Sequence, residues 1–185
     1  EMIDKLRDTT QSHDRCSVVE VMGRNAGYIA LNTGIAVGAL VTLIPEVQYD
    51  LERDVIAKMK ATQKTGKQHF IIIIAEGVGH AQDLANEIQS RTGIDSRATV
   101  LGHVQRGGSP SMADRMLAEQ FGNKAVRLLK DGIGDRVVGI RKNEIIDLDI
   151  IEAVSMKKNK EISETFQNLE NIWDEYEVYE KFENE

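Results

Sequence analysis

A glycine-flanked arginine stands where an apolar run of the sequence ends. Residues 17–22 (SVVEVM) have the composition of a strand, and the turn at 23–27 (GRNAG) separates them from an apolar helical segment. Glycine lets a backbone come close to a ligand, free N–H groups at a helix start attract anions, and the guanidinium of Arg24 matches phosphate oxygens. The turn therefore indicates a phosphate site, although a tight turn with a solvent-facing Arg24 fits the same residues.

A second glycine-rich turn carries two more phosphate donors. Residues 102–110 (GHVQRGGSP) follow a predicted strand and place His103 and Arg106 three positions apart. Both side chains can donate to one phosphate, His103 more strongly when it is protonated. Ser109 is the expected N-cap of the next helix, and Pro110 its first residue. The alternative is a structured turn whose histidine is satisfied within the protein.

A carboxylate follows the most apolar stretch of the chain. Glu76 comes directly after residues 69–75 (HFIIIIA) and precedes a glycine. It can accept hydrogen bonds from sugar hydroxyls or act as a base, and a helix cap or an ion pair is the alternative. Because ligands of open α/β sheets bind beyond the carboxyl ends of strands, the three features together predict a phosphosugar site. They do not distinguish a kinase from an isomerase or a binding protein.

The segments between these features alternate between two kinds. Short apolar runs predict strands at 17–22, 40–44, 69–75, 97–101 and 136–140. Longer segments with helical periodicity are found at 28–39, 51–63, 82–91 and 111–129. Strands that alternate with helices form βαβ units. We therefore predict an α/β fold in three layers, a mostly parallel sheet with helices on both faces.

The amino-acid composition of the chain limits the classes of partner that it can bind. The chain has 23 Lys and Arg against 30 Asp and Glu, a net charge of −7, which argues against nucleic-acid and anionic-membrane partners. The one cysteine, Cys16, can form no internal disulfide and has the character of a core residue on a strand. No residue spacing suggests a metal site. No apolar run approaches the roughly 18 residues of a membrane span, and the first residues do not resemble a signal peptide, so we expect a cytoplasmic protein.

The last 29 residues, 157–185, differ from the rest. A basic linker is followed by apolar residues at steps of three and four, which predicts an amphipathic, acidic tail helix. Its apolar stripe consists of Ile162, Phe166, Leu169, Trp173 and Tyr176. We therefore divide the chain into a domain at 1–156 and a linker with a tail helix at 157–185. The chain begins without Met inside an expected helix, and we expect it to be a fragment.

Two stretches, VVEVMGRNAGYIAL and RATVLGHVQRGGSP, resemble the substrate-domain signatures of 6-phosphofructokinases. The segments IPEV and AEG fall in the order that this family shows, and the resemblance covers about residues 1–155. It implies a phosphofructokinase-like fold in which residues 1–156 are the fructose 6-phosphate-binding, C-terminal half of the enzyme. The compact segments resemble the short bacterial, ATP-dependent type.

The resemblance also implies roles for individual residues. Met22, Gly23 and Arg24 match the loop that contacts fructose 6-phosphate, and Arg24 matches the arginine that reaches the phosphoryl group in transit. Glu76 matches the acid that holds a sugar hydroxyl.

His103 and Arg106 match the pair that grips the 6-phosphate. Arg15 and Arg97 match arginines that the family sends across a subunit interface to the neighbour's substrate. The implied assembly is therefore a homo-oligomer, a tetramer in the family, with shared sites.

The implied reaction moves a phosphoryl group from MgATP to the 1-hydroxyl of fructose 6-phosphate. The family's hydroxyl-activating Asp and its nucleotide loop are absent from this sequence and belong to an N-terminal half. We therefore expect the chain alone to bind neither Mg²⁺ nor ATP and to have no kinase activity. A pyrophosphate-dependent phosphofructokinase and a non-catalytic phosphosugar-binding module remain the alternatives.

An effector site is implied less completely. Arg7, Gly38 and Lys67 match positions that bind a nucleotide diphosphate or phosphoenolpyruvate in bacterial members. Leu40 stands where an acid that helps to hold the effector's metal is common, and Gln68 where a second Lys is common. We expect a reduced or altered response to ADP.

Overall fold

The computed structural model describes residues 1–156, so the predicted linker and tail helix at 157–185 lie outside the described residues. The described chain forms two compact units, Glu1–Arg106 and a second that begins at Gly107.

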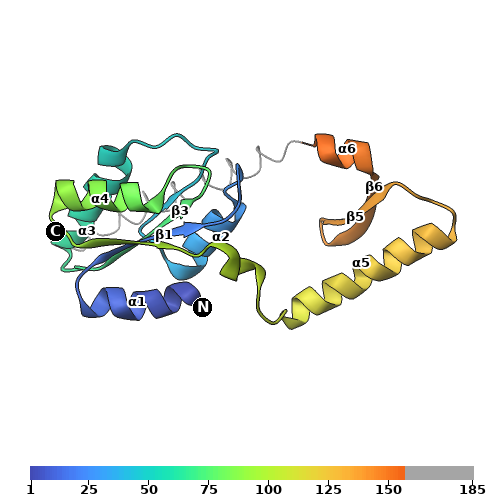
Figure 1. The fold of residues 1–185 in the computed structure, drawn as a ribbon, viewed down its shortest axis with the longest axis horizontal. Coiled ribbons are helices and arrows are strands. Elements are labelled where there is room, and N and C mark those ends of the chain that lie inside the picture. The colour runs from blue at the N-terminus through green and yellow to red at the C-terminus, as the bar shows by residue number, and fades with distance from the viewer. Residues whose placement is uncertain (157–185) are drawn as a thin grey trace, which may run out of the picture. The chain divides into compact units, whose positions relative to one another are not determined.

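The first unit is built on a four-stranded parallel sheet (Figure 1). Its strands are β1 (Cys16–Val21), β2 (Val41–Leu43), β3 (Phe70–Ala75) and β4 (Ser96–Val100), in the order β2-β3-β1-β4. All six residues of β3 are buried, as expected for an isoleucine-rich strand with neighbours on both edges and helices on both faces. The predicted α/β class and the parallel sheet are confirmed.

Helices cover both faces of this sheet. They are α1 (Met2–Ser12), α2 (Tyr28–Val37), α3 (Ala57–Lys64), which continues a π-helical segment η1 (Leu51–Ile56), and α4 (Ala81–Thr92). Side chains of β1 alternate between two cores: Val18 packs with α3 and α4, and Val19 packs with α1 and α2. The helix predicted at 51–63 is therefore present, but it begins with a π-helical segment.

Helix α2 packs closely on β2 because one of its positions has no side chain. A Cβ at Gly34 would lie 2.0 Å from Thr42 Oγ1, so only glycine fits there. The helix ends at Gly38, which adopts the left-handed conformation with φ 59°. This close packing sets the position of the loop that precedes α2.

The second unit contains α5 (Met112–Lys130), β5 (Arg136–Arg141), β6 (Glu144–Asp149) and α6 (Ile150–Ser155). The strand predicted at 136–140 exists, but it pairs antiparallel with β6 in a separate two-stranded sheet. Lys142 and Asn143 both have positive φ, 50° and 68°, which is the conformation of a two-residue type I′ hairpin. This local turn makes β5 pair with the strand that follows it, so the predicted strand lies outside the parallel sheet.

The start of α5 also differs from the prediction. The N-cap is Ser111, not Ser109, and the first helical residue is Met112 rather than Pro110. Ser111 Oγ accepts from the Asp114 N–H at 3.2 Å, and Asp114 Oδ2 accepts from the Ser111 N–H at 2.9 Å. This reciprocal capping box satisfies donors at both positions, which Ser109 could not do without an acid three residues later.

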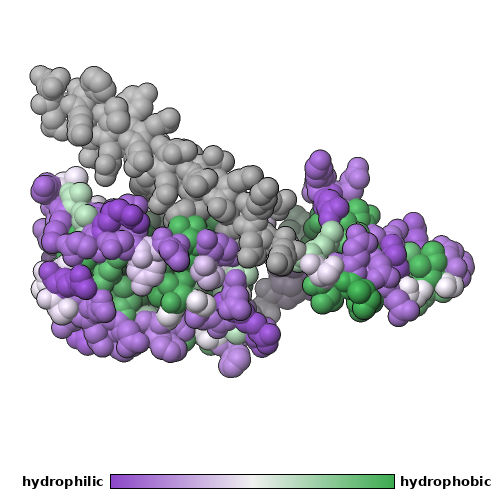
Figure 2. Space-filling view, turned by 90° about the horizontal axis from the view of Figure 1, so that it is seen from above, coloured by the Kyte–Doolittle hydropathy of each residue, from purple (hydrophilic) through white to green (hydrophobic). Residues whose placement is uncertain are grey.

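The surfaces of the two units carry apolar side chains among polar ones (Figure 2). In the second unit, large exposed apolar residues include Met112, Met116, Val126, Leu129, Ile151 and Val154. None of the helices in residues 1–156 is both long enough and apolar enough to cross a membrane.

Candidate functional site

The 22–27 loop connects β1 to α2 and has a strained backbone. Arg24 has φ 52°, a left-handed conformation that is uncommon for a residue with a side chain. A Cβ at Gly23 would lie 2.3 Å from the carbonyl oxygen of Ala26, so this position requires glycine. The Ala26 N–H donates to the Gly23 carbonyl at 3.0 Å and closes the turn. The side chain of Arg24 is therefore presented from a tightly defined backbone.

Glu76 holds this loop from the end of β3. Its Oε1 accepts hydrogen bonds from the backbone N–H of Gly23 at 3.0 Å and of Arg24 at 2.5 Å. These bonds hold the pKa of the Glu76 carboxyl below its usual range, and the positive charges of Arg106 and Arg24 lower it further. Glu76 is therefore ionised at neutral pH, which favours a role as hydrogen-bond acceptor over one as base.

The two bonds leave one carboxylate oxygen available, because within the described residues no protein donor is bonded to Glu76 Oε2. They also occupy N–H groups that the sequence suggested for a bound anion. The next donor of the loop, the Gly27 N–H, is likewise held by Glu46, at 2.9 and 3.0 Å to its two oxygens. Positive charge at this site therefore comes from side chains rather than from these backbone amides.

The residue after Glu76 supports the loop by contact. A Cβ at Gly77 would lie 2.2 Å from the carbonyl oxygen of Arg24, so the Arg24 backbone lies directly against Gly77. This explains the glycine that follows Glu76 in the sequence.

His103 and Arg106 lie on a short 3₁₀ helix, η2 (Gly102–Arg106), at the end of β4. Both side chains are exposed, and the charge of Arg106 acts on Glu76. Between them, Gln105 Oε1 accepts from the Met22 N–H at 3.0 Å and joins η2 to the 22–27 loop. Sequence reasoning gave Gln105 no role, although it is part of the same motif.

Arg15 and Arg97 lie at the opposite end of the sheet. Arg15 precedes β1 and Arg97 is near the start of β4, whereas the 22–27 loop follows the last residue of β1. A strand of six residues is about 20 Å long. Arg15 and Arg97 are therefore grouped near the opposite end of the strands from Arg24 and Glu76.

These two arginines share one acid that the sequence analysis did not identify. Arg15 Nε lies 2.7 Å from Asp95 Oδ2, and Arg97 Nε lies 3.1 Å from Asp95 Oδ1. Asp95 thus brings together two guanidinium groups that are distant in sequence. The sequence places Asp95 two residues before Arg97, so a pairing of these two residues could have been predicted. The pairing of Asp95 with Arg15 could not, because it depends on the β1–β4 register.

Two of the three effector candidates are neighbours. The guanidinium of Arg7 donates to the carbonyl of Val37, the residue before Gly38. Lys67 is exposed in the segment that precedes β3. Leu40, which replaces the expected acid, packs against the core instead of presenting a charge.

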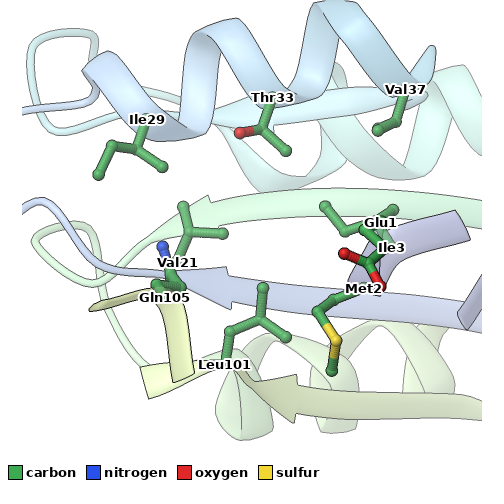
Figure 3. A pocket seen from close by; sticks show the side chains of 9 residues that line it. All are labelled: Glu1, Met2, Ile3, Val21, Ile29, Thr33, Val37, Leu101 and Gln105. Atoms are coloured by element: carbon green, nitrogen blue, oxygen red, sulfur yellow. The ribbon is translucent and has the colours of Figure 1, made fainter. Parts of the chain in front are cut away.

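A hollow of about 280 Å³, lined by both polar and apolar side chains, lies beside α2 (Figure 3). Ile29, Thr33 and Val37 of α2 line one wall, and Gln105 lies at one end close to Val21. The lining contains no arginine, lysine or histidine, so the hollow lacks the charges that a phosphate requires. Among residues 1–156, no three His, Cys, Asp or Glu side chains are grouped to hold a metal ion.

The fold and the site place this chain in a known class, the parallel α/β proteins whose ligands bind beyond the carboxyl ends of the strands. Here that edge carries Arg24, Glu76, His103 and Arg106. A family model described as phosphofructokinase matches residues 1–129. The chain belongs to the phosphofructokinase family.

Similar proteins agree with this assignment. The chain is 56% identical over 155 residues to an ATP-dependent 6-phosphofructokinase of Bacillus cytotoxicus, and 57% identical to one of Bacillus thuringiensis. Each match covers 84% of this chain and 48% of the relative, so the chain spans about half the length of these curated relatives. Among solved structures, phosphofructokinase from Saccharomyces cerevisiae is 32% identical with a TM-score of 0.78, over 90% of this chain and 23% of that one. Pichia pastoris phosphofructokinase in the T-state is 33% identical with a TM-score of 0.74, over 90% of this chain and 19% of that one.

Proposed function

We propose that residues 1–156 form the fructose 6-phosphate-binding half of an ATP-dependent 6-phosphofructokinase. The observation that carries this proposal is the grouping of Arg24, Glu76 and Arg106 at one edge of the sheet, with an ionised carboxylate between two positive charges. A sugar phosphate needs both kinds of group, since its phosphate requires cations and its hydroxyls require acceptors. The named relatives, which are ATP-dependent, support ATP as the donor.

Each residue has a separate task in this proposal. Arg106 and His103 hold the 6-phosphate, and Glu76 Oε2 accepts from a sugar hydroxyl. Arg24 stabilises the charge of the phosphoryl group during transfer, a step that depends mainly on positioning and electrostatics. MgATP and the base that activates the 1-hydroxyl are supplied from outside this chain.

We also propose that the complete site is shared between two copies of the chain. Arg15 and Arg97 lie near the end of the sheet opposite Arg24, where both pair with Asp95. A second copy can present this pair to the phosphate held by Arg106 of the first. The assembly is then a homo-oligomer, and substrate binding depends on how the copies are arranged.

Calorimetric titration of the 185-residue chain with fructose 6-phosphate tests the binding site. We expect Arg106→Ala to weaken binding at least about 10-fold, because a charge-assisted bond to phosphate is lost. Arg91→Ala is the matched control, since Arg91 is an exposed arginine of α4 that pairs with Glu52 and Glu87. Equal binding by the wild-type chain and Arg106→Ala would contradict the proposed site.

Mixing two defective chains tests the shared site. An Arg106→Ala chain and an Arg15→Ala/Arg97→Ala chain should each bind weakly, and their mixture should recover binding because a mixed pair contains one intact site. A mixture that binds no better than its components would refute sharing. Separately, the chain alone should show no turnover of fructose 6-phosphate with MgATP in a coupled assay.

A further inference from the structure

Gln105 lies between the two residues that are expected to grip a phosphate, yet its side chain is bonded to the backbone of another loop. His103 and Arg106 are exposed, whereas Gln105 is half-buried and its Oε1 accepts from the Met22 N–H at 3.0 Å. The two bonded residues are 83 positions apart in the chain. The bond therefore ties η2 to the loop that presents Arg24.

The 22–27 loop needs such a restraint. Arg24 has a left-handed backbone, and the N–H groups of Gly23 and Arg24 are held by Glu76. Glu76 is fixed by β3 and Gln105 by η2, so each restrains the loop from a different element. Met22 is the first residue beyond β1, where a change in backbone direction would carry Arg24 with it.

We propose that Gln105 is a positioning residue that fixes the distance between Arg24 on the loop and Arg106 on η2, so that both act on one sugar phosphate. This inference rests on the proposed function. Glutamine suits the position because its amide oxygen accepts the Met22 N–H without adding a negative charge. Glutamate would accept the same bond, but its charge would repel the phosphate.

Two substitutions at position 105 distinguish the effect of the hydrogen bond to Met22 from the effect of side-chain charge. Gln105→Met keeps the length of the side chain and removes the acceptor. Gln105→Glu keeps an acceptor and adds a charge. Gln82→Met is the matched control, since Gln82 is an exposed glutamine of α4 that bonds only locally to Asn86.

Amide hydrogen exchange measured by NMR on the full chain reports the position of the loop without any ligand. We expect Gln105→Met to speed exchange at Met22, Gly23 and Arg24 about fivefold, the effect of losing one hydrogen bond, with no change at Ile72 in β3. Gln105→Glu should retain slow exchange at the three loop amides. Gln82→Met should match the wild type throughout.

Calorimetry with fructose 6-phosphate then tests the consequence for binding. We expect both Gln105→Met and Gln105→Glu to weaken binding about fivefold or more, the first through displacement of the loop and the second through repulsion. Unchanged loop exchange in Gln105→Met would overturn the proposal. So would equal acceleration at the loop and at Ile72, because that result assigns Gln105 to stability alone. If the wild-type chain does not bind the sugar phosphate, the proposed function fails, and the exchange data still decide whether Gln105 holds the loop.

Discussion

Gly77→Ala gives a direct test of how β3 supports the loop that carries Arg24. The added Cβ would lie 2.2 Å from the Arg24 carbonyl oxygen, and the contact is with backbone, so no side-chain rotation relieves it. The loop must move by about 1 Å to reach an ordinary contact distance. The bond from the Gly23 N–H to Glu76, now 3.0 Å, would then exceed the range of a good hydrogen bond.

The expected magnitudes follow from this displacement. Because Gly77 is exposed and the loop can yield, we expect the free energy of unfolding to fall by roughly 1 kcal/mol, the low end for overpacking. Fructose 6-phosphate binding should weaken about 10-fold or more, since the Arg24 contact and the geometry of Glu76 change together. Binding should therefore suffer more than stability.

Urea denaturation and calorimetric titration measure the two quantities. Gly122→Ala is the control, because a Cβ there meets nothing within 4 Å and the residue lies inside α5. We expect it to raise the free energy of unfolding by about 0.5–1 kcal/mol and to leave binding unchanged. A Gly77→Ala chain with wild-type binding would show that the Arg24 backbone does not depend on this contact.

Three further predictions concern other parts of the structure. Because the folded-state pKa of Glu76 is lowered, its bonds to the loop are present above the unfolded pKa of about 4.3 and are lost as pH falls through the folded value. NMR shifts of the Gly23 amide should therefore stay constant from pH 8 down through the ordinary titration range of Glu and change only below that range, and a change centred near neutral pH would contradict this assignment. Burial raises the pKa of Cys16 to about 12, so a thiol reagent at pH 8 should modify it only after unfolding, and rapid modification of the native chain would refute its buried position. In a full-length enzyme that contains this segment, Leu40→Glu should increase sensitivity to MgADP by placing a carboxylate where an acid that helps to hold the effector's metal is common in the family, and an unchanged response in a steady-state assay would argue against this effector hypothesis.

The sequence by itself determined the elements of the first unit and the residues of the candidate site. An isoleucine-rich run has few alternatives to a buried strand, which is why β3 was predicted to within one residue of Phe70–Ala75. Arg24, Glu76, His103 and Arg106 were found because each stands just beyond a predicted strand, where α/β sheets place their ligands. These inferences depend only on residue type and local spacing.

Only the tertiary structure decided which groups act on one another. The hydrogen bond between Glu76 and the Gly23 N–H joins residues 53 positions apart, and the bond between Gln105 and the Met22 N–H joins residues 83 positions apart. Bonds over such separations arise from the order and register of the parallel strands. The pairing of Asp95 with both Arg15 and Arg97 has the same origin, because the β1–β4 register brings their segments together. The structure also separated this arginine pair from Arg24 by the length of β1, a distance that no local pattern in the sequence contains. The sequence thus identified the candidate phosphate-binding residues, and strand order and register determined which of them lie together.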